Sequence, residues 1–589
     1  MKKLLLVPVG LICLVVASKA QAVFTGLGSV SWNVGSIDNR SIFRTNFAMG
    51  EGPNWPGIAK TLSAGVYDPV SNQTFLVYAG GLRLDGVHSA LDPYVMAFNH
   101  NTHSWQSAIK LAQTESLGVP GDDHNYSQIA LDNQGFLHVF HTYHNAGINI
   151  LHATSKAPRS VGTSVSDWQV GNIPNTCHNT YGATFTDNQG EIYVFFRSSE
   201  GSSRPLPDPA WYEPEALVKS SDSGRTWTPR AIVIDPGRHP SCQECAKNPD
   251  GSYIDNHCPA GRDSCCASSI VHNVGPNEPG PTTIYVNYMT QDKVRNGVWM
   301  TFNEFVGHGG YPYDNSIFPK RLVFFDFTTD HFISADGRDW GPTLDYNEFA
   351  TANCCNLGPN NFNFHSNVVV IEDQVNRIPT VYFTRTINAQ EFIYQVNWNP
   401  TSNRWIETDI STNFGPVERL MTGEYRPGLG TDLYVSSKLD SHLPFSQCQP
   451  PVTASLNFNY PLMLYNNKNG WQGIRLFGNA EVGPAGEVVD HRSWEITRTN
   501  PFNLISNAHP ALKAYLTTYK LTCSQPTSWD PDFAHVLPVG TYYALGEQPL
   551  SAIPGDLDGD GKVDSIDLLQ AIAGLNIFNY NSVVANYGK

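Results

Sequence analysis

Basic residues are scarce in this chain. Charged residues make up only 15% of it, and 37 Lys and Arg stand against 53 Asp and Glu, which gives a formal net charge of −16 at pH 7. This balance argues against nucleic acid as a partner and against broad electrostatic capture of any polyanion. An acidic ligand would therefore need a local basic pocket.

Long apolar runs are equally rare. The one clear run, residues 4–17, follows two lysines and precedes the small-residue pattern Ala-Gln-Ala at 20–22. It is too short to span a bilayer comfortably, and its flanks are those of a secretory signal peptide. We expect residues 1–22 to be removed, the mature protein to be secreted and extracellular, and no membrane span.

Helical periodicity is almost absent before residue 550. The chain holds 49 Gly, 40 Pro and 12% aromatic residues, a composition typical of a large β protein. Two turns, Asp132 to Gly135 and Asp187 to Gly190, both read Asp-Asn-Gln-Gly and lie 55 residues apart. Each joins two strand-like segments, and a repeated hairpin of this period predicts an all-β fold made of β-propeller blades.

A further propeller mark follows the second repeat. Residues 220–227 read Ser-Ser-Asp-Ser-Gly-Arg-Thr-Trp and match the Asp-box pattern S-x-D-x-G-x-T-W. Its Asp and Gly build a tight turn and its Trp packs against the blade, so the motif is structural. It also occurs in sialidases and other carbohydrate-active proteins.

Four side chains of the repeated hairpins form the candidate catalytic set. His124 and Tyr181 open first strands, and His144 and Arg197 close second strands. Because hairpin strands are antiparallel, all four are expected on one rim of the disc, where they would contribute little to the core. Two imidazoles, a phenol and a guanidinium suit the removal of a proton next to a carboxylate.

Other hairpins place weaker candidates on the same rim. Residues 284–288 read as the second strand of a hairpin that His272 begins, and residues 380–385 as the strand paired to the one that His365 begins. We expect His272, His365 and Arg385 to contact substrate.

Five cysteines cluster in the middle of the chain. They are Cys242, Cys245, Cys258, Cys265 and Cys266. The C-x-x-C spacing and nearby histidines suit structural zinc, whereas export favours disulfides, and both alternatives stay open. Further candidates for the same cluster are Cys177, Cys354 and Cys355. We expect any such site to be structural.

The chain ends in a predicted calcium loop. Its ligands would be Asp556, Asp558, Asp560, Lys562 through its carbonyl, Asp564 and Asp567. A helix is expected after it, at 568–575. The final Asp and the C-terminal position resemble dockerin modules, which implies a cohesin-like or cell-surface partner. Dockerins have two such loops, and residues 577–587 lack a second. We place a linker at 546–553 and the module at 554–589.

The four-residue set resembles that of the β-propeller ulvan lyases of polysaccharide lyase families twenty-four and twenty-five. Those enzymes carry two His about twenty residues apart, as His124 and His144 are, and a later Tyr and Arg sixteen apart, as Tyr181 and Arg197 are. The resemblance implies a seven-bladed propeller over residues 23–545, structural metal sites, and β-elimination on an acidic sulfated rhamnose–uronate polysaccharide. No organic cofactor is expected.

The roles follow from the chemistry of elimination. Arg197 would neutralise the uronate carboxylate, which makes the adjacent C5 proton more acidic. His124 is favoured as base, because a phenol would need a lowered pKa to act as one, and Tyr181 as acid. His144 would bind the carboxylate or orient His124. Two alternatives stay open, a sialidase-like glycoside hydrolase and a non-catalytic carbohydrate-binding propeller.

Overall fold

The computed structural model describes residues 31–36, 41–44, 65–82, 92–113, 126–143, 148–198, 213–236, 283–305, 320–345, 355–357, 363–388, 390–426, 428–437, 462–477, 480–482, 488–490, 505–506, 509, 512–523 and 536–547. Over these residues the protein is all-β. The only helical turns among them are two short 3-10 segments, η2 (Val165–Asp167) and η3 (Ser411–Asn413). The predicted all-β class is therefore confirmed for the described part of the chain.

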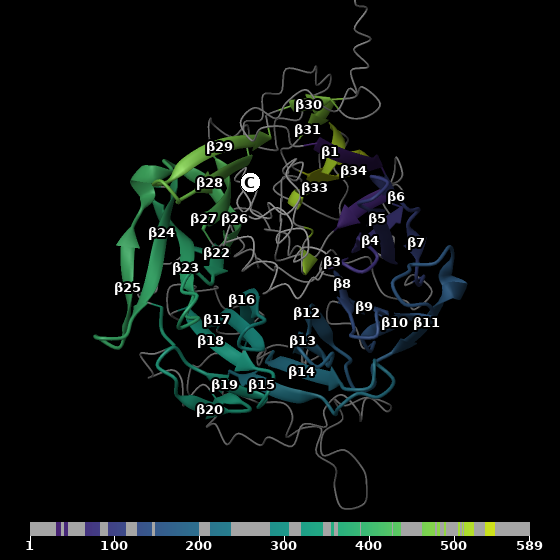
Figure 1. Cartoon of the computed structure of the whole chain (residues 1–589), viewed down its shortest axis with the longest axis horizontal. Coiled ribbons are helices and arrows are strands. Elements are labelled where there is room, and N and C mark those ends of the chain that lie inside the picture. Colours follow the sequence, from purple (N-terminus) through teal and green to yellow (C-terminus); the bar gives the residue numbers. More distant parts are fainter. Residues whose placement is uncertain are drawn as a thin grey trace, which may run out of the picture.

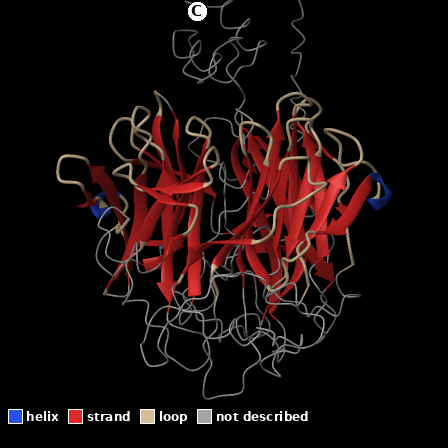
Figure 2. Ribbon diagram, turned by 90° about the horizontal axis from the view of Figure 1, so that it is seen from below, coloured by secondary structure: helices blue, strands red, loops and turns tan. Residues whose placement is uncertain are grey.

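The sheets follow one another in chain order around a common centre, which is the arrangement of a β-propeller (Figure 1). Seen from the side, most strands run across the thickness of the disc (Figure 2). The first strands of several neighbouring sheets contact one another and line the centre of the ring (Figure 1).

The first two sheets of the ring are antiparallel meanders with two additions. The first contains β3 (Gly65–Asp68), β4 (Gln73–Leu82), β5 (Asp92–Asn99), β6 (Ser104–Trp105) and β7 (Ile109–Lys110), with β2 (Ser41–Arg44) beside β4 and β32 (Ile505–Ser506) parallel to β3. The second contains β8 (Tyr126–Leu131), β9 (Leu137–Thr142), β10 (Leu151–Ser155) and β11 (Trp168–Asn172).

The next two sheets have the same plan. One contains β12 (Asn179–Thr186), β13 (Ile192–Ser198), β14 (Glu215–Ser220) and β15 (Ala231–Asp235), with β21 (Leu344–Asp345) parallel to β15. The other contains β16 (Thr283–Asp292), β17 (Gly297–Phe305), β18 (Arg321–Asp326), β19 (His331–Ile333) and β20 (Asp339–Gly341).

The remaining strands complete the ring. An eight-stranded sheet contains β22 (Asn363–Val370), β23 (Thr380–Ile387), β24 (Gln390–Asn399), β25 (Arg404–Asp409), β26 (Val417–Arg426), β27 (Gly430–Ser437), β28 (Leu462–Asn466) and β29 (Gln472–Phe477). A small pair follows, β30 (Ala480–Val482) and β31 (Val488–Asp490). The last sheet joins β33 (Leu512–Cys523) and β34 (Val536–Glu547) to β1 (Ser31–Ser36), so strands from both ends of the chain close the ring (Figure 1).

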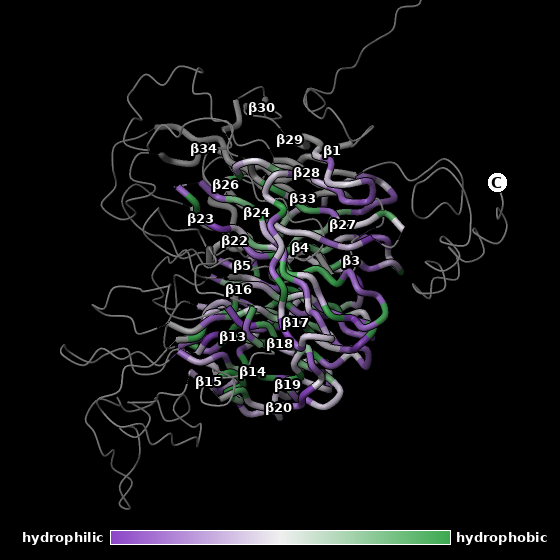
Figure 3. The backbone as a smooth tube through the Cα atoms, turned by 90° about the vertical axis from the view of Figure 1, so that its left-hand side faces the viewer, coloured by the Kyte–Doolittle hydropathy of each residue, from purple (hydrophilic) through white to green (hydrophobic). Residues whose placement is uncertain are grey.

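Hydrophobic cores lie between neighbouring sheets, and strand β13 shows how they form. All seven of its residues are buried. Tyr193 and Phe195 pack toward the β16–β20 sheet, whereas Val194 and Phe196 pack toward the β8–β11 sheet. Both faces are covered, so the strand reads as an apolar run without alternation, and each such side chain contributes about 1.5–3 kcal/mol. Hydrophobic segments accordingly follow the strands in Figure 3.

The two repeated turns are equivalent in structure. Asp132 Oδ1 accepts hydrogen bonds from the amides of Gln134 (2.9 Å) and Phe136 (2.8 Å). Asp187 Oδ1 accepts from the amides two and four residues on, at 2.9 and 2.7 Å. The closing glycines have φ of +88° and +90°, which glycine adopts without strain. The predicted hairpin repeat is therefore confirmed.

The Asp box also forms as predicted. Asp222 accepts from the amide and the hydroxyl of Thr226, at 2.8 and 2.7 Å, and the Ser220 hydroxyl donates to Asp222 at 2.9 Å. Trp227 meets Phe140 and His152 of the preceding sheet edge-on. The motif thus pins one sheet to the next.

Across the described residues, no helix combines the length and apolarity needed to cross a membrane.

Candidate active site

Tyr181 lies near the start of strand β12, at a β-bulge. Thr180 pairs with Arg197 and Ala183 with Phe195, so Tyr181 and Gly182 together face one residue of β13. Tyr181 has φ of +52°, an uncommon value for a bulky side chain. The bulge turns the Tyr181 side chain out of the regular alternation of the strand.

Gly182 allows β12 to approach the preceding sheet closely. A Cβ atom at this position would lie 2.6 Å from Gln128 Oε1 on β8 and 2.8 Å from Thr142 Cγ2 on β9. A side chain larger than hydrogen would therefore push β12 away from its neighbours. The glycine that follows Tyr181 is a requirement of packing.

Arg197 lies between two aromatic rings. Its guanidinium carbon is 4.5 Å from the ring centroid of Tyr181 and 4.6 Å from that of Tyr285 on β16. The two ring centroids are 6.2 Å apart and the ring planes are inclined by 51°. Both contacts are cation–π interactions, and the second reaches across to the next sheet of the ring.

Glu213 supplies the counter-charge for Arg197. Its Oε2 atom is 3.3 Å from Arg197 Nη1, and both side chains are buried. Burial alone would lower the pKa of Arg197, but the Glu213 carboxylate and the phenols of Tyr285 and Tyr181 outweigh it and raise that pKa. The guanidinium is therefore a permanent buried cation. Glu215, which is also buried, lies opposite Arg197 in the β13–β14 pairing.

Asn179 joins β12 to the segment that precedes it in the ring. Its Oδ1 accepts from the amide of Tyr143 at 2.8 Å, and its Nδ2 donates to the carbonyls of Ile148 (2.8 Å) and Thr176 (2.6 Å). The buried amide of Asn179, two residues before Tyr181 in sequence, thus holds residues 143 and 148. These two residues lie on either side of the predicted His144 in sequence.

The structure therefore brings together two of the four predicted catalytic residues, Tyr181 and Arg197. Their exposed fractions are 3% and 0%. Both lie at the same end of the β12–β13 hairpin, as expected. The expectation that they contribute little to the core is wrong, because both are buried and Arg197 contacts both rings and Glu213. His124 and His144 lie outside the described residues.

The weaker substrate candidates are placed only in part. His272 lies outside the described residues, and His365 is described only as the third residue of β22. Arg385 forms an ion pair with Glu407 on β25 and lies 5.0 Å from the ring centroid of Tyr394. Its contacts with Glu407 and Tyr394 are thus made within its own sheet.

Tyr285 was not among the predicted site residues, because residues 284–288 were interpreted as the second strand of a hairpin. Residues 284–288 belong to β16, which is the first strand of its sheet and pairs with β17, and not the second strand of a hairpin. Tyr181, Tyr285 and His365 are each the third residue of the first strand of their sheets. Aligning β12 with β16 could have found Tyr285 from the sequence. Glu213 had no such signal.

The predicted metal sites cannot be placed. The cysteine cluster from Cys242 to Cys266 and the calcium loop from Asp556 to Asp567 lie outside the described residues. Cys177 is disulfide-bonded, and Cys355 is buried. Within the described ranges, no group of three His, Cys, Asp or Glu side chains could hold a metal ion.

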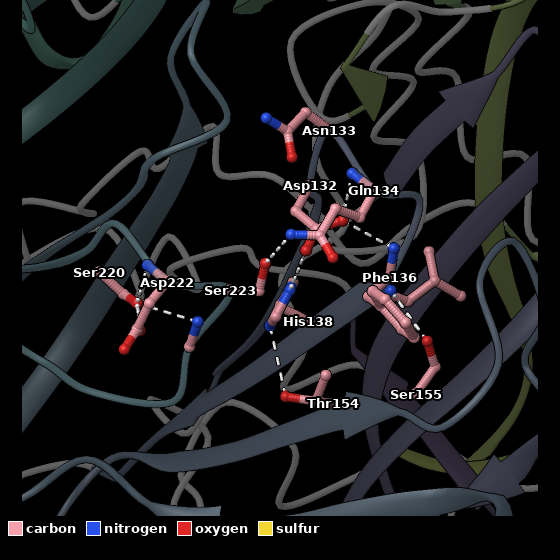
Figure 4. A network of polar contacts seen from close by, with 12 residues as sticks. Asp132, Asn133, Gln134, Phe136, His138, Thr154, Ser155, Ser220, Asp222 and Ser223 are labelled. Carbon is pink, nitrogen blue, oxygen red and sulfur yellow. Dashed lines mark hydrogen bonds and ion pairs between the residues drawn. The ribbon is translucent and has the colours of Figure 1, made fainter.

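A second buried polar network lies at the other end of the β8–β11 sheet (Figure 4). His138 lies 3.3 Å from Asp132 and 3.1 Å from His152, through opposite ring nitrogens. Burial of Asp132 would raise its pKa, but hydrogen bonds from His138, Ser223 and the Phe136 amide lower it. Burial, and then His138, lower the pKa of His152 to about 3. The network is part of the joint with the Asp box and lies far along the strands from Arg197.

The geometry around Arg197 defines the chemistry available. The Arg197 nitrogens Nε, Nη1 and Nη2 are buried and have no hydrogen-bond partner among the described residues, so a ligand carboxylate can meet them in the bidentate manner that arginine favours. The phenol of Tyr181 is next to that cation. A proton donor or acceptor beside a buried cation suits reactions in which negative charge develops on a bound carboxylate.

Comparison with known proteins agrees with this description. The family model described as BNR repeat-containing family member matches residues 90–215, which include β5 to β13. The ulvan lyase of family 25 from Pseudoalteromonas sp. (strain PLSV) is 30% identical over 154 residues, 23% of this chain and 28% of that protein. The ulvan lyase of Nonlabens ulvanivorans is 28% identical over 153 residues, 23% of this chain and 29% of that protein.

The curated relatives are thus matched over little more than a quarter of their length. A solved structure of the family 25 ulvan lyase, bound to a GlcA(1-4)Rha3S repeat, aligns with a TM-score of 0.51 and 15% identity, over 86% of this chain and 96% of that one. This likeness concerns the fold. The resemblance to ulvan lyases is confirmed for family twenty-five, while the resemblances to family twenty-four and to dockerins stay predictions.

Proposed function

We propose that this protein is a secreted polysaccharide lyase that cleaves an ulvan-like acidic polysaccharide by β-elimination. The observation that carries the proposal is the Arg197 guanidinium, a permanent buried cation held beside the Tyr181 phenol near the start of an inner strand. Both curated relatives are named ulvan lyases, and each matches 23% of this chain. Arg197 supplies a local positive charge for an acidic substrate, beside the buried carboxylates of Glu213 and Glu215.

The proposed reaction uses the chain's own side chains. The uronate carboxylate binds the N–H edge of Arg197, and the C5–H bond breaks as a base takes the proton. The electron pair forms the C4–C5 double bond, the C4–O bond breaks, and the leaving oxygen takes a proton. We assign the base to His124 and the acid to Tyr181, with His144 orienting His124 or binding the carboxylate. His272, His365 and Arg385 are proposed substrate contacts.

The finer architecture belongs to the same proposal. We propose seven blades, counting β22–β25 and β26–β29 as two, because only the Glu391 and Val417 pairing joins β24 to β26. We also propose a signal peptide at 1–22, a propeller at 23–545 and a dockerin-like calcium module at 554–589 with a cohesin-like or cell-surface partner. Within the cysteine cluster from Cys242 to Cys266, we propose structural zinc or disulfides.

One observation favours a second candidate. Tyr181 and the buried Glu213 both contact Arg197, and a sialidase-like hydrolase can use a tyrosine as its nucleophile. The products separate the two reactions. Elimination from ulvan creates a conjugated unsaturated uronate that absorbs ultraviolet light, whereas hydrolysis releases reducing ends without it. Incubation of the purified protein with ulvan, followed for both signals, tests the proposal, and reducing ends alone would favour the hydrolase.

A further inference from the structure

The two rings leave the orientation of Arg197 incompletely determined. The ring centroids of Tyr181 and Tyr285 lie 4.5 and 4.6 Å from the guanidinium carbon. A cation–π contact is weakly directional, so it holds the group near the rings without fixing which N–H bonds point at a ligand. A charged partner close to one of the guanidinium nitrogens can do that.

Glu213 is the partner in the right place. Its Oε2 atom lies 3.3 Å from Arg197 Nη1, in an ion pair whose geometry is not that of a hydrogen bond. A guanidinium has five N–H donors in a rigid fork, so a carboxylate on Nη1 leaves donors on other edges for a second carboxylate. The same ion pair that orients the fork therefore remains compatible with a bound uronate.

The backbone of Glu213 is itself fixed on both sides. Its carbonyl accepts from the amide of Ile284 at 2.8 Å, next to Tyr285 on β16. The following residue, Pro214, accepts from the amide of Ser198 at 2.9 Å, next to Arg197 on β13. Glu213 thus spans the joint between two sheets and is tied to the neighbours of both Tyr285 and Arg197.

We infer that Glu213 is a positioning residue, which orients the Arg197 guanidinium so that its remaining N–H edge meets the substrate carboxylate. The inference rests on the proposed lyase function for its catalytic consequence. Charge on the carboxylate group grows as the C5 proton leaves, so a misdirected guanidinium loses stabilisation mainly in the transition state. Loss of Glu213 should therefore lower kcat more than it changes KM.

Three variants separate orientation from charge. Glu213→Gln keeps an oxygen acceptor of the same length and removes the charge, and kcat on ulvan should fall about tenfold. Glu213→Asp keeps the charge but withdraws the carboxylate from Nη1, and Glu213→Ala removes both. For these two we expect kcat to fall about 10²–10³-fold, the range for loss of one preorganised contact, with KM changed less than about threefold. Glu191→Gln, which alters a half-buried ion pair with Lys219 at 4.0 Å, is the matched control and should retain wild-type kcat.

A second measurement does not depend on turnover. Urea unfolding of Glu213→Gln, Arg197→Met and the double variant forms a double-mutant cycle, and the two single shifts in midpoint should sum to more than the double shift. Full kcat in Glu213→Asp, or additive midpoints, would overturn the inference. A wild type that eliminates nothing from ulvan but shows this coupling would contradict the proposed function and still support the orientation of Arg197 by Glu213.

Discussion

The guanidinium carbon of Arg197 lies 4.5 Å from the ring centroid of Tyr181, although the bulge at Tyr181 and Gly182 interrupts the pairing of their strands. Without the bulge, side chains of neighbouring positions would point to opposite faces of the sheet. The extra residue turns the phenol toward the face on which Arg197 meets Tyr285. A local irregularity of β12 thus creates the candidate site.

Replacing Tyr181 by Phe should test the proton transfer. The ring and its contact with Arg197 remain, and only the hydroxyl is lost. We expect elimination to slow by about 10²–10⁴-fold, the usual contribution of a positioned proton-transfer group. Tyr285→Phe is the comparison, because it removes a hydroxyl from the other ring and should slow the reaction far less. Steady-state rates of both variants test this prediction. Equal losses of rate would contradict the assignment of Tyr181 as the acid.

Gly182 should not tolerate a methyl group. The added Cβ of Gly182→Ala would meet Thr142 Cγ2 at 2.8 Å, and relief requires β12 to move. Overpacking of this kind costs about 1–3 kcal/mol of unfolding free energy. Gly171→Ala is the control, since a Cβ there has nothing within 4 Å, and it should change stability by less than about 0.5 kcal/mol. Equal unfolding midpoints for the two variants would contradict the packing argument.

Replacing Asn179 should destabilise the fold more than replacing an exposed asparagine that also bridges two sheets. Asn179→Ala removes the partners of the Tyr143 amide and of the Ile148 and Thr176 carbonyls, and should cost about 2 kcal/mol or more. Asn133→Ala removes one exposed bond to the Gln189 carbonyl and should cost less than about 0.5 kcal/mol. Chemical denaturation measures both, and a neutral Asn179→Ala would show that β12 needs no such clamp.

The free energy of unfolding should fall as the pH is lowered, because His152 is buried in its neutral form. Its pKa is about 3 when folded, below the ordinary value of 6.5, so the unfolded chain binds the extra proton as the pH falls below 6.5. The stability that the neutral imidazole contributes is present above pH 6.5 and is lost as the pH falls toward 3. Linkage gives a loss of about 2 kcal/mol between pH 7 and pH 5. His152→Gln should flatten this dependence in urea titrations, and an unchanged dependence would contradict the assignment to His152.

Much of the arrangement followed from sequence because the decisive signals are local. The turns at Asp132 and Asp187 and the Asp box at Ser220 depend on side chains bonding to amides a few residues away. The meeting of Tyr181 with Arg197 follows from one hairpin. A second turn, Ser334 to Trp340, is also held by local side-chain hydrogen bonds. In it, Trp340 Nε1 donates to Ser334 Oγ at 3.0 Å. This turn does not match the Asp-box pattern because it is one residue shorter.

Other features depended on contacts between sheets. Tyr285 reaches Arg197 from the next sheet, and Glu213 is 16 residues beyond Arg197 with no motif around it. The burial of Arg197 has the same origin, since it needs side chains from two sheets at once. Sequence patterns report the period of one strand, and they carry no direct record of which strands meet across the ring.

The central claim is that Arg197 neutralises a uronate carboxylate during elimination, and Arg197→Lys tests it most directly. Lysine keeps the positive charge but lacks the planar fork that can meet Glu213 and a second carboxylate together. The decisive measurement is the initial rate of ultraviolet absorbance on ulvan for wild type and variant. The account predicts steady production of unsaturated uronate by the wild type and a rate about 10²–10³-fold lower for the variant. Equal rates for the two proteins, or reducing ends from the wild type without ultraviolet absorbance, would contradict it.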